Sequence, residues 1–148
     1  MKKVFLIAVL FFVFVAGSSF YNTAITVHSR ASLISTVYAY GNEITDCRIG
    51  IHARNMTGVS IGSFLNGSTP VTAPNTITFN QSQYNDYHHG IWLENCAKAR
   101  VQQNSITKNS TVPPHPGYTV EGITLNECAS ALVNLNTITE MNTPVHVI

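Results

Sequence analysis

Charged residues are scarce in this chain, and the two signs nearly cancel. Lys and Arg number 8 and Asp and Glu number 7 among 148 residues, so the formal net charge is +1 at pH 7. The chain therefore has no basic stripe that would hold a phosphate backbone or an anionic membrane surface. Nucleic acid is not an expected partner, and most of the polar side chains are Asn, Thr and Ser.

Cysteine and aspartate are also few, and neither is arranged as a metal site. The three cysteines form no Cys-x-x-Cys pair, and no His-x-x-x-His spacing occurs. Asp46 and Asp86 are the only aspartates, and they lie at unrelated positions. They give no cluster of carboxylates for calcium. The sequence therefore predicts no metal site and no cofactor.

The N-terminus has the layout of a secretory signal. Met1-Lys2-Lys3 is followed by thirteen apolar residues, from Val4 to Ala16, and then by Gly17. As a helix this run spans roughly 20 Å, which is short of the ~30 Å hydrocarbon core of a bilayer. We interpret residues 1–17 as a signal peptide rather than an uncleaved anchor. The protein is therefore expected to be secreted, at the cell surface or periplasmic.

What the chain does contain is a repeated tetrapeptide. Asn-x-Ile-Thr recurs in steps of 33, 29 and 32 residues, beginning at Asn42, Asn75, Asn104 and Asn136. This recurrence indicates stacked supersecondary units rather than one closed core. A second segment, Gly-Ile-x-Leu or a close variant, begins at Gly50, Gly90 and Gly122.

Apolar and polar residues alternate within the Gly-Ile segments, and a period of two predicts strands. We expect the strands to stack in parallel, about 4.8 Å apart, as successive turns of a coil. The isoleucines of the tetrapeptides would stack inside. Their asparagines would stack at a corner, in left-handed backbone geometry and with amides bonded along the column. The insertion from Leu65 to Pro74 carries turn signals and is interpreted as a loop.

The pattern Gly-Ile-x-Leu followed by Val-x-x-Asn-x-Ile-Thr resembles the repeat of right-handed parallel β-helix proteins. That group holds pectate lyase-like enzymes, polygalacturonases, alginate epimerases and periplasmic NosD-like proteins. The resemblance covers residues 31–148 and implies an all-β, right-handed parallel β-helix, a solenoid of about four to five turns. Residues 18–40 would form an N-terminal cap or a degenerate first turn, and 41–148 the repeats. The scaffold does not define the activity, because many chemistries share it.

Cys96 and Cys128 occupy the same repeat position, with Met56 as the third member. On adjacent turns they would lie near ~4.8 Å, within the range that a disulfide permits. The alternatives are a disulfide of an exported protein and an interior ladder of free thiols. The ladder is favoured because stacked side chains point in parallel. Cys47 has no partner in either case.

The outward positions of the Gly-Ile strands supply the candidate binding residues. An aromatic ring with hydrogen-bonding neighbours suits a sugar. Our first hypothesis is therefore that the protein binds a polysaccharide or other glycan on this face. The predicted contacts are His52, Arg54, Trp92, Asn126 and Glu121. The alternative for Trp92 is packing beneath the long loops at 81–89 and 111–120.

Catalysis is the second hypothesis, as a polysaccharide lyase, a glycoside hydrolase-like enzyme or a fragment of one. Glu94 beside Arg54 could be a tuned acid or base, and His89, which shares a repeat position with Glu121, could be a base. The plainer interpretations are a cross-strand ion pair and a polar loop histidine. The chain also lacks the carboxylate pair that glycosidases use.

A structural role, as a surface or assembly protein without catalysis, is the third hypothesis. The chain ends at Ile148 inside an expected strand, with no polar cap after it. An apolar end of the coil would then be exposed. The two expectations are self-association through this end and a missing segment of a longer β-helix.

Overall fold

The structure is a computed structural model that describes residues 23–28, 37–66, 68–80, 86–109, 117 and 119–148. The predicted signal peptide and part of the predicted cap lie outside these residues. The described residues form strands, turns and connections. The described residues contain no helix that is long and apolar enough to cross a bilayer.

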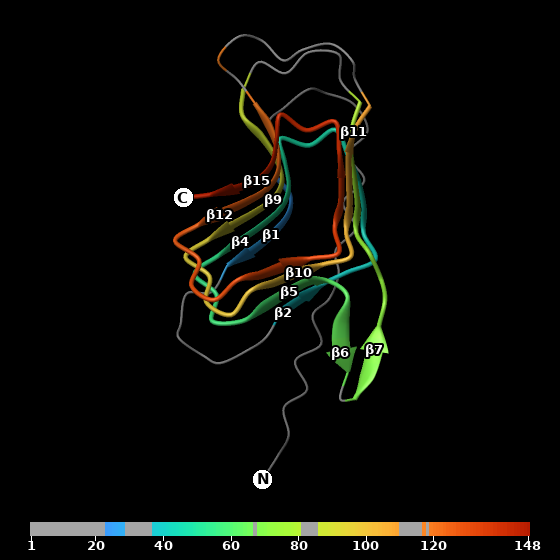
Figure 1. The fold of residues 1–148 in the computed structure, drawn as a ribbon, viewed down its shortest axis with the longest axis vertical. Helices are drawn as coiled ribbons and strands as arrows, with labels where there is room; N and C mark the ends of the chain where they lie inside the picture. Colours follow the sequence, from blue (N-terminus) through green and yellow to red (C-terminus); the bar gives the residue numbers. More distant parts are fainter. Residues whose placement is uncertain (1–22, 29–36, 67, 81–85, 110–116, 118) are drawn as a thin grey trace.

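Three parallel sheets wind into a coil, and together they form the predicted parallel β-helix (Figure 1). Sheet A has the order β1 (Thr23–His28), β4 (Ile49–Arg54), β9 (His88–Glu94), β12 (Val120–Asn126), β15 (Thr143–Val147). Sheet B has the order β13 (Leu132–Asn134), β10 (Arg100–Gln102), β5 (Val59–Gly62), β2 (Val37–Ala39). Sheet C has the order β14 (Thr137–Thr139), β11 (Ser105–Lys108), β8 (Thr76–Phe79), β3 (Glu43–Thr45).

The interior of the coil is built from ladders of branched apolar side chains. In sheet A, Ile91 pairs with Ile51 on one side and Ile123 on the other, and all three are fully buried. In sheet C the isoleucines of the four tetrapeptides pair in register, as predicted: Ile44, Ile77, Ile106 and Ile138. Each fully buried isoleucine contributes roughly 1.5–3 kcal/mol, so the ladders are the main source of stability.

The glycine of the Gly-Ile segment is required by the isoleucine of the tetrapeptide. A Cβ on Gly90 would lie 2.6 Å from the carbonyl oxygen of Gly122 and 2.7 Å from Cγ2 of Ile106. Real Cβ atoms do not approach so closely, so an alanine would force the core apart. Gly50 and Gly122 meet Ile77 and Ile138 in the same way. The two sequence motifs are therefore two sides of one packing contact.

The asparagines of the tetrapeptide form the predicted ladder of amides at the corner between sheets B and C. The Nδ2 of Asn75 donates to Oδ1 of Asn104 at 2.7 Å, and the Nδ2 of Asn104 donates to Oδ1 of Asn136 at 2.9 Å. The predicted left-handed geometry of the asparagines is wrong. In three turns it belongs to the preceding residue: Gly41 with a φ of 67°, and Gln103 and Leu135 with a φ of 56° each. That residue makes the corner, so the asparagine can point inward.

The insertion after β5 is not simply a loop. Phe64–Asn66 (β6) pairs antiparallel with Thr69–Val71 (β7), and this ribbon projects from the coil (Figure 1). Pro70 lies in β7 and pairs with Leu65, because a proline is tolerated in an edge strand. The ring of Phe64 lies 4.4 Å from that of Tyr38. The insertion is thereby held against sheet B.

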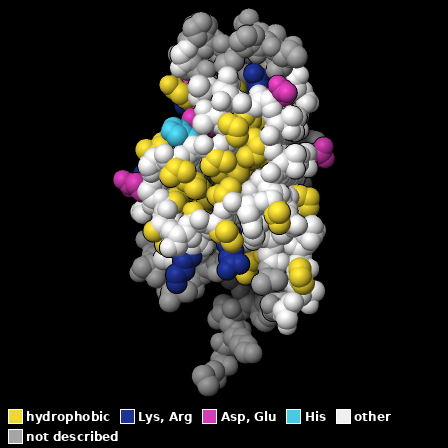
Figure 2. All heavy atoms as spheres, viewed as in Figure 1, with side chains coloured by type: hydrophobic (Ala, Val, Ile, Leu, Met, Phe, Trp, Pro, Cys, Tyr) yellow, Lys and Arg dark blue, Asp and Glu magenta, His cyan; other side chains and the backbone are white. Residues whose placement is uncertain are grey.

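The last turn exposes the apolar side chains that other turns bury. Figure 2 shows hydrophobic side chains gathered on the end of the coil that faces the viewer. Val145 pairs with the fully buried Ile123 but is itself 44% exposed. The large exposed hydrophobic residues of this turn are Leu132, Leu135, Val145, Val147 and Ile148.

The cysteines form the thiol ladder rather than the disulfide. Cys47, Cys96 and Cys128 are all free. Cys96 is fully buried, and its Sγ donates to the carbonyl oxygens of Ala53 and Glu94 at 3.4 Å each. Burial is the largest influence that raises the pKa of the Cys96 thiol. The protonated, unreactive form is therefore favoured.

Candidate functional site

Sheet A presents the two predicted columns of polar residues on its outer face. His52 pairs with Trp92, Trp92 with Thr124, and Thr124 with His146. In the second column, Glu94 pairs with Arg54 on one side and Asn126 on the other. The repeat alignment therefore predicted the correct cross-strand pairs for the residues of these two columns.

Trp92 lies between two imidazole rings. The ring centroids of His52 and His89 are each 4.8 Å from that of Trp92, with interplanar angles of 19° and 29°. His52 approaches from β4, whereas His89 leans toward Thr124 and Glu121 of β12. Both faces of the indole are thus covered, and no open ring face is left for a sugar. The indole Nε1 is buried and has no hydrogen-bond partner among the described residues.

Glu121 joins two histidines from different turns. Its carboxylate is nearly buried, with 7% of the side chain exposed. One oxygen lies 2.9 Å from Nδ1 of His146, and the other lies 3.2 Å from Nδ1 of His89. The latter oxygen also accepts a hydrogen bond of 2.5 Å from Oγ1 of Thr124. The repeat alignment predicted that His89 and Glu121 are neighbours. It missed that His146, which pairs with Thr124 across the sheet, also reaches Glu121.

The hydrogen bonds fix which imidazole nitrogen carries the proton. Because Thr124 gives its hydroxyl proton to Glu121, its oxygen accepts from Nδ1 of His89 at 2.8 Å. We therefore assign the proton of His89 to Nδ1, with the lone pair on Nε2. Burial is the largest influence on the pKa of His89 and lowers it, although Glu121 raises it. The imidazole is therefore neutral at neutral pH.

Glu94 belongs to a separate group on the same face. One of its oxygens lies 3.3 Å from Nε of Arg54 and 3.5 Å from Nε2 of His52. This matches the plainer interpretation of Glu94 as a member of a cross-strand ion pair. Among the described residues, no hydrogen bond or ion pair joins Glu94 to His89, which instead contacts Glu121 and Thr124. Their role as a catalytic pair stays a prediction.

A metal site with three protein ligands is not preformed in the described part of the chain. No group of three or more His, Cys, Asp or Glu side chains there is arranged to hold a metal ion. In the cluster around Glu121, the carboxylate faces Nδ1 of both imidazoles, at 2.9 Å from His146 and at 3.2 Å from His89. The ring nitrogens that do not face the carboxylate are Nε2 of His89 and Nε2 of His146.

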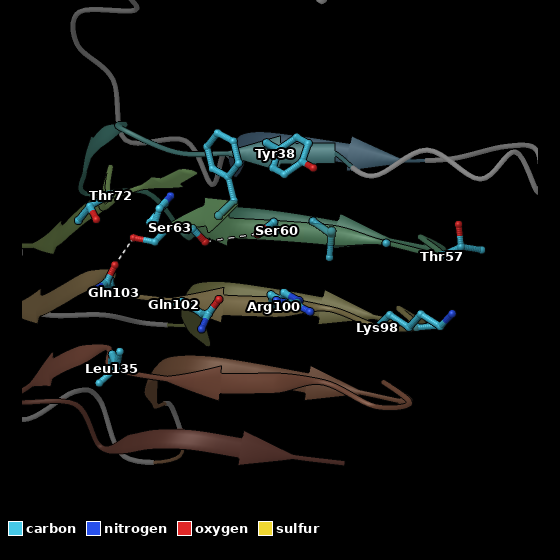
Figure 3. Close-up of a pocket in the computed structure, with 15 residues that line it drawn as sticks. Tyr38, Thr57, Ser60, Ser63, Thr72, Lys98, Arg100, Gln102, Gln103 and Leu135 are labelled. Atoms are coloured by element: carbon cyan, nitrogen blue, oxygen red, sulfur yellow. Dashed lines mark hydrogen bonds between the residues drawn. The ribbon is translucent and has the colours of Figure 1, made fainter. Parts of the chain in front are cut away.

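A groove on sheet B was not predicted. It has a volume of about 1000 Å³ and lies over successive stacked strands (Figure 3). Its walls include Tyr38, Arg100 and Gln102, which face outward on β2 and β10. The signal was available in the sequence, since Arg100 and Gln102 flank the buried Val101.

Comparison with known families fits the architecture. A family model described as "Periplasmic copper-binding protein (NosD)" matches residues 15–146, which is most of the chain. The chain belongs to the NosD family. The description of the NosD family as periplasmic agrees with the export that the N-terminus predicts. No curated protein and no solved structure matched the chain.

Proposed function

We propose that this NosD-family protein binds copper outside the cytoplasm, through the imidazoles of His89 and His146. The observation that supports the proposal is the single buried carboxylate of Glu121, which holds Nδ1 of both rings. Histidines that bind metals usually donate their other N–H to a carboxylate, which fixes the tautomer and raises the basicity of the ligand nitrogen. Imidazole nitrogen is also a suitable ligand for copper.

The surroundings of the two rings favour this role. Burial lowers the pKa of His89 and so favours the neutral imidazole. Its Nε2 therefore does not have to lose a proton before it binds an ion. Its neighbour His146 has 43% of its side chain exposed, which gives an ion a route from solvent. Thr124 supports the arrangement, because its hydroxyl donates to Glu121 and accepts from His89. Two protein ligands leave other positions for solvent or for a partner that supplies or receives the ion.

The experiment is a competition between the purified protein and a chromophoric copper chelator, with Cu(I) and Cu(II) tested separately. Replacing Glu121 by Gln keeps the shape but removes the charge that orients both rings. We expect the copper affinity to fall by about 10–100-fold. Replacing both His89 and His146 by Gln should abolish binding at this site.

The matched control is Glu43→Gln, which removes an exposed carboxylate from β3 in sheet C. It should leave the copper affinity unchanged. Equal losses in Glu121→Gln and Glu43→Gln, with both proteins folded, would show that net charge and not the cluster holds copper. If the double histidine variant keeps its full affinity, copper binds at a different site and the proposal is wrong.

Glycan binding on the outer face of sheet A is our second proposal, with catalysis by Glu94 and His89 as its enzymatic form. It is supported by the second column of sheet A, in which the exposed Arg54 and the half-buried Asn126 lie on either side of Glu94. A sugar would be held there by hydrogen bonds, since both faces of the indole are covered. Titration of the fluorescence of the single tryptophan with soluble polysaccharides tests binding. Loss of turnover with retained binding in Glu94→Gln would favour catalysis.

A further inference from the structure

The groove on sheet B is shaped by small residues in its middle strand. Across the sheet, Ser60 of β5 lies between Tyr38 of β2 and Arg100 of β10. In the next column, Gly62 of β5 pairs with Gln102 of β10. A Cβ on Gly62 would lie 2.0 Å from the carbonyl oxygen of Gln102, and its φ is +92°, so no side chain fits there. The middle strand therefore forms a low floor between two taller walls (Figure 3).

One wall of the groove is aromatic. Tyr38 is 45% exposed, and its ring is held by Phe64 at a centroid distance of 4.4 Å. Phe64 also packs against Tyr40 at 4.8 Å. Because Phe64 begins the ribbon of β6 and β7, the insertion fixes the position of the aromatic wall. In contrast to Trp92, Tyr38 keeps part of its surface open.

The opposite wall carries positive charge that no acidic side chain of the described residues neutralises. Lys98 and Arg100 line the groove, and none of the described residues that line it is acidic. Neither cation belongs to an ion pair of the described residues. The remaining polar groups are hydroxyls and amides, among them Ser60, Gln102 and Gln103.

We propose that this groove binds an acidic glycan, with a uronate carboxylate on Arg100 and a neighbouring sugar ring against Tyr38. A guanidinium matches a carboxylate in a bidentate, charge-assisted pair. A tyrosine ring offers the flat apolar surface that a sugar needs. Gln102 donates from Nε2 to Asn134, so its amide oxygen can accept from a sugar hydroxyl.

Other ligand classes fit the groove less well. A nucleic acid carries a charge every ~1.7 Å of duplex and would need a longer row of cations than Lys98 and Arg100 provide. A peptide that extends a sheet needs a free strand edge. The floor strand β5 is instead paired on both sides, with β2 and β10. An uncharged glycan would leave Arg100 without an anion.

The test is binding of the full exported protein to oligomers of polygalacturonate, alginate and hyaluronate. Fully methyl-esterified polygalacturonate is the matched probe, because it has the same sugars without the charge. We expect at least one of the acidic oligomers to bind and the ester to bind about tenfold more weakly. Affinity should also fall as salt is raised. Failure of all three acidic oligomers to bind would overturn the proposal, as would equal binding of polygalacturonate and its ester.

Variants locate the site. Arg100→Gln should weaken binding of the acidic oligomer by about tenfold, which is the loss of one charge-assisted pair. Tyr38→Ala should weaken it, whereas Tyr38→Phe, which keeps the ring, should not. Arg54→Gln probes the other face. If Arg54→Gln loses binding and Arg100→Gln keeps it, the glycan binds on sheet A, and the proposal that it binds in the groove is wrong.

The proposal is independent of copper binding, and the variants separate the two. Arg100→Gln and Tyr38→Ala change sheet B and should leave the copper affinity at its original value. Glu121→Gln changes sheet A and should leave binding of the acidic oligomer unchanged. Loss of oligomer binding in Glu121→Gln, with the protein folded, would contradict the groove as a separate site.

Discussion

The outer faces of sheets A and B use the same repeat but handle charge in opposite ways. On sheet A, Glu94 is paired with Arg54 and His52, and Glu121 with His89 and His146. On sheet B, Lys98 and Arg100 have no acidic partner in the described structure. The carboxylates of sheet A are therefore paired within the protein, whereas the two cations on sheet B are not paired with an acid among the described residues.

The difference shows how a solenoid separates functions. Each turn contributes one strand to each sheet, so a residue on one face does not alter the other face directly. A network of hydrogen-bonded side chains positions a few atoms accurately, which suits an ion. Small residues flanked by larger ones leave a hollow, which suits an extended ligand. The two faces are connected only through the core. A substitution in the core is therefore expected to affect both faces.

The largest expected effect comes from removing part of that core. Ile106 is fully buried in sheet C and packs against the position of Gly90 in sheet A. Ile106→Ala should lower the free energy of unfolding by about 2–5 kcal/mol, since it removes buried surface and leaves a cavity. Denaturant titration followed by circular dichroism measures this loss. Ile148→Ala, at an exposed position, should change stability by less than about 0.5 kcal/mol, and equal losses would contradict a continuous core.

A smaller effect should come from the amide ladder, and it should weaken sheet B more than sheet A. Asn104 donates to the carbonyl oxygens of Ile61 and Gln102 at 3.1 and 3.2 Å, which lie beside the groove. Asn104→Leu removes these hydrogen bonds and the buried amide-to-amide bonds with Asn75 and Asn136, and should cost about 1–3 kcal/mol of stability. It should also weaken binding of the acidic oligomer more than binding of copper.

The control for this prediction is an exposed bond of the same kind. Asn109 donates from Nδ2 to Oδ1 of Asn80 at 2.8 Å in an exposed setting. Asn109→Ala should change stability by less than about 1 kcal/mol, because water replaces the lost bond. If both variants lose the same stability, burial of the ladder contributes nothing, and the prediction for Asn104 is wrong.

Much of the fold could be predicted from the sequence because the repeat is a packing rule. The spacing of Asn-x-Ile-Thr and the alternation after Gly90 gave the parallel strands, the inward isoleucines and the amide ladder. The left-handed residues were misplaced by one, because Asn has a general preference for that geometry. Gln103 adopts it only because Asn104 must turn inward.

The candidate sites were harder to predict than the fold. The alternation placed Trp92 outward, but it carried no information on whether neighbouring rings would cover it. The cluster of Glu121 depends on the directions of side chains from three strands, and the groove depends on an insertion that breaks the repeat. Repeats predict what is common to all turns. Function depends on where one turn differs from the next.

Acidity should distinguish the two faces. The pKa of His89 is lowered chiefly by burial, and Arg48 and His88 also lower it. An unperturbed histidine has a pKa of ~6.5. Below this pH, His89 takes up a proton in the unfolded chain but stays largely neutral in the folded chain. Stability should therefore be constant with respect to this group at higher pH and should fall as the pH drops below that value.

The measurement is the free energy of unfolding against pH for the natural protein and for His89→Gln. The variant should lose part of the decline at low pH, and the remainder should include His88, whose pKa is also lowered by burial. Copper at neutral His89 should be retained to a lower pH than at an unperturbed histidine. Arg100 does not titrate in this range, so the groove should retain its charge. A pH profile that is identical in the variant would contradict the burial of His89.

The smallest expected effect is the removal of an ion pair from the outer face of sheet A. Arg54 has 53% of its side chain exposed, and its Nε lies 3.3 Å from Glu94. Arg54→Gln should change the free energy of unfolding by less than about 1 kcal/mol, because water screens the pair. The difference should shrink further when the titration is repeated in 1 M salt, where the Debye length is about 3 Å. A large loss that persists in high salt would mean that Arg54 positions Glu94 and His52, and that the network of sheet A extends across both columns.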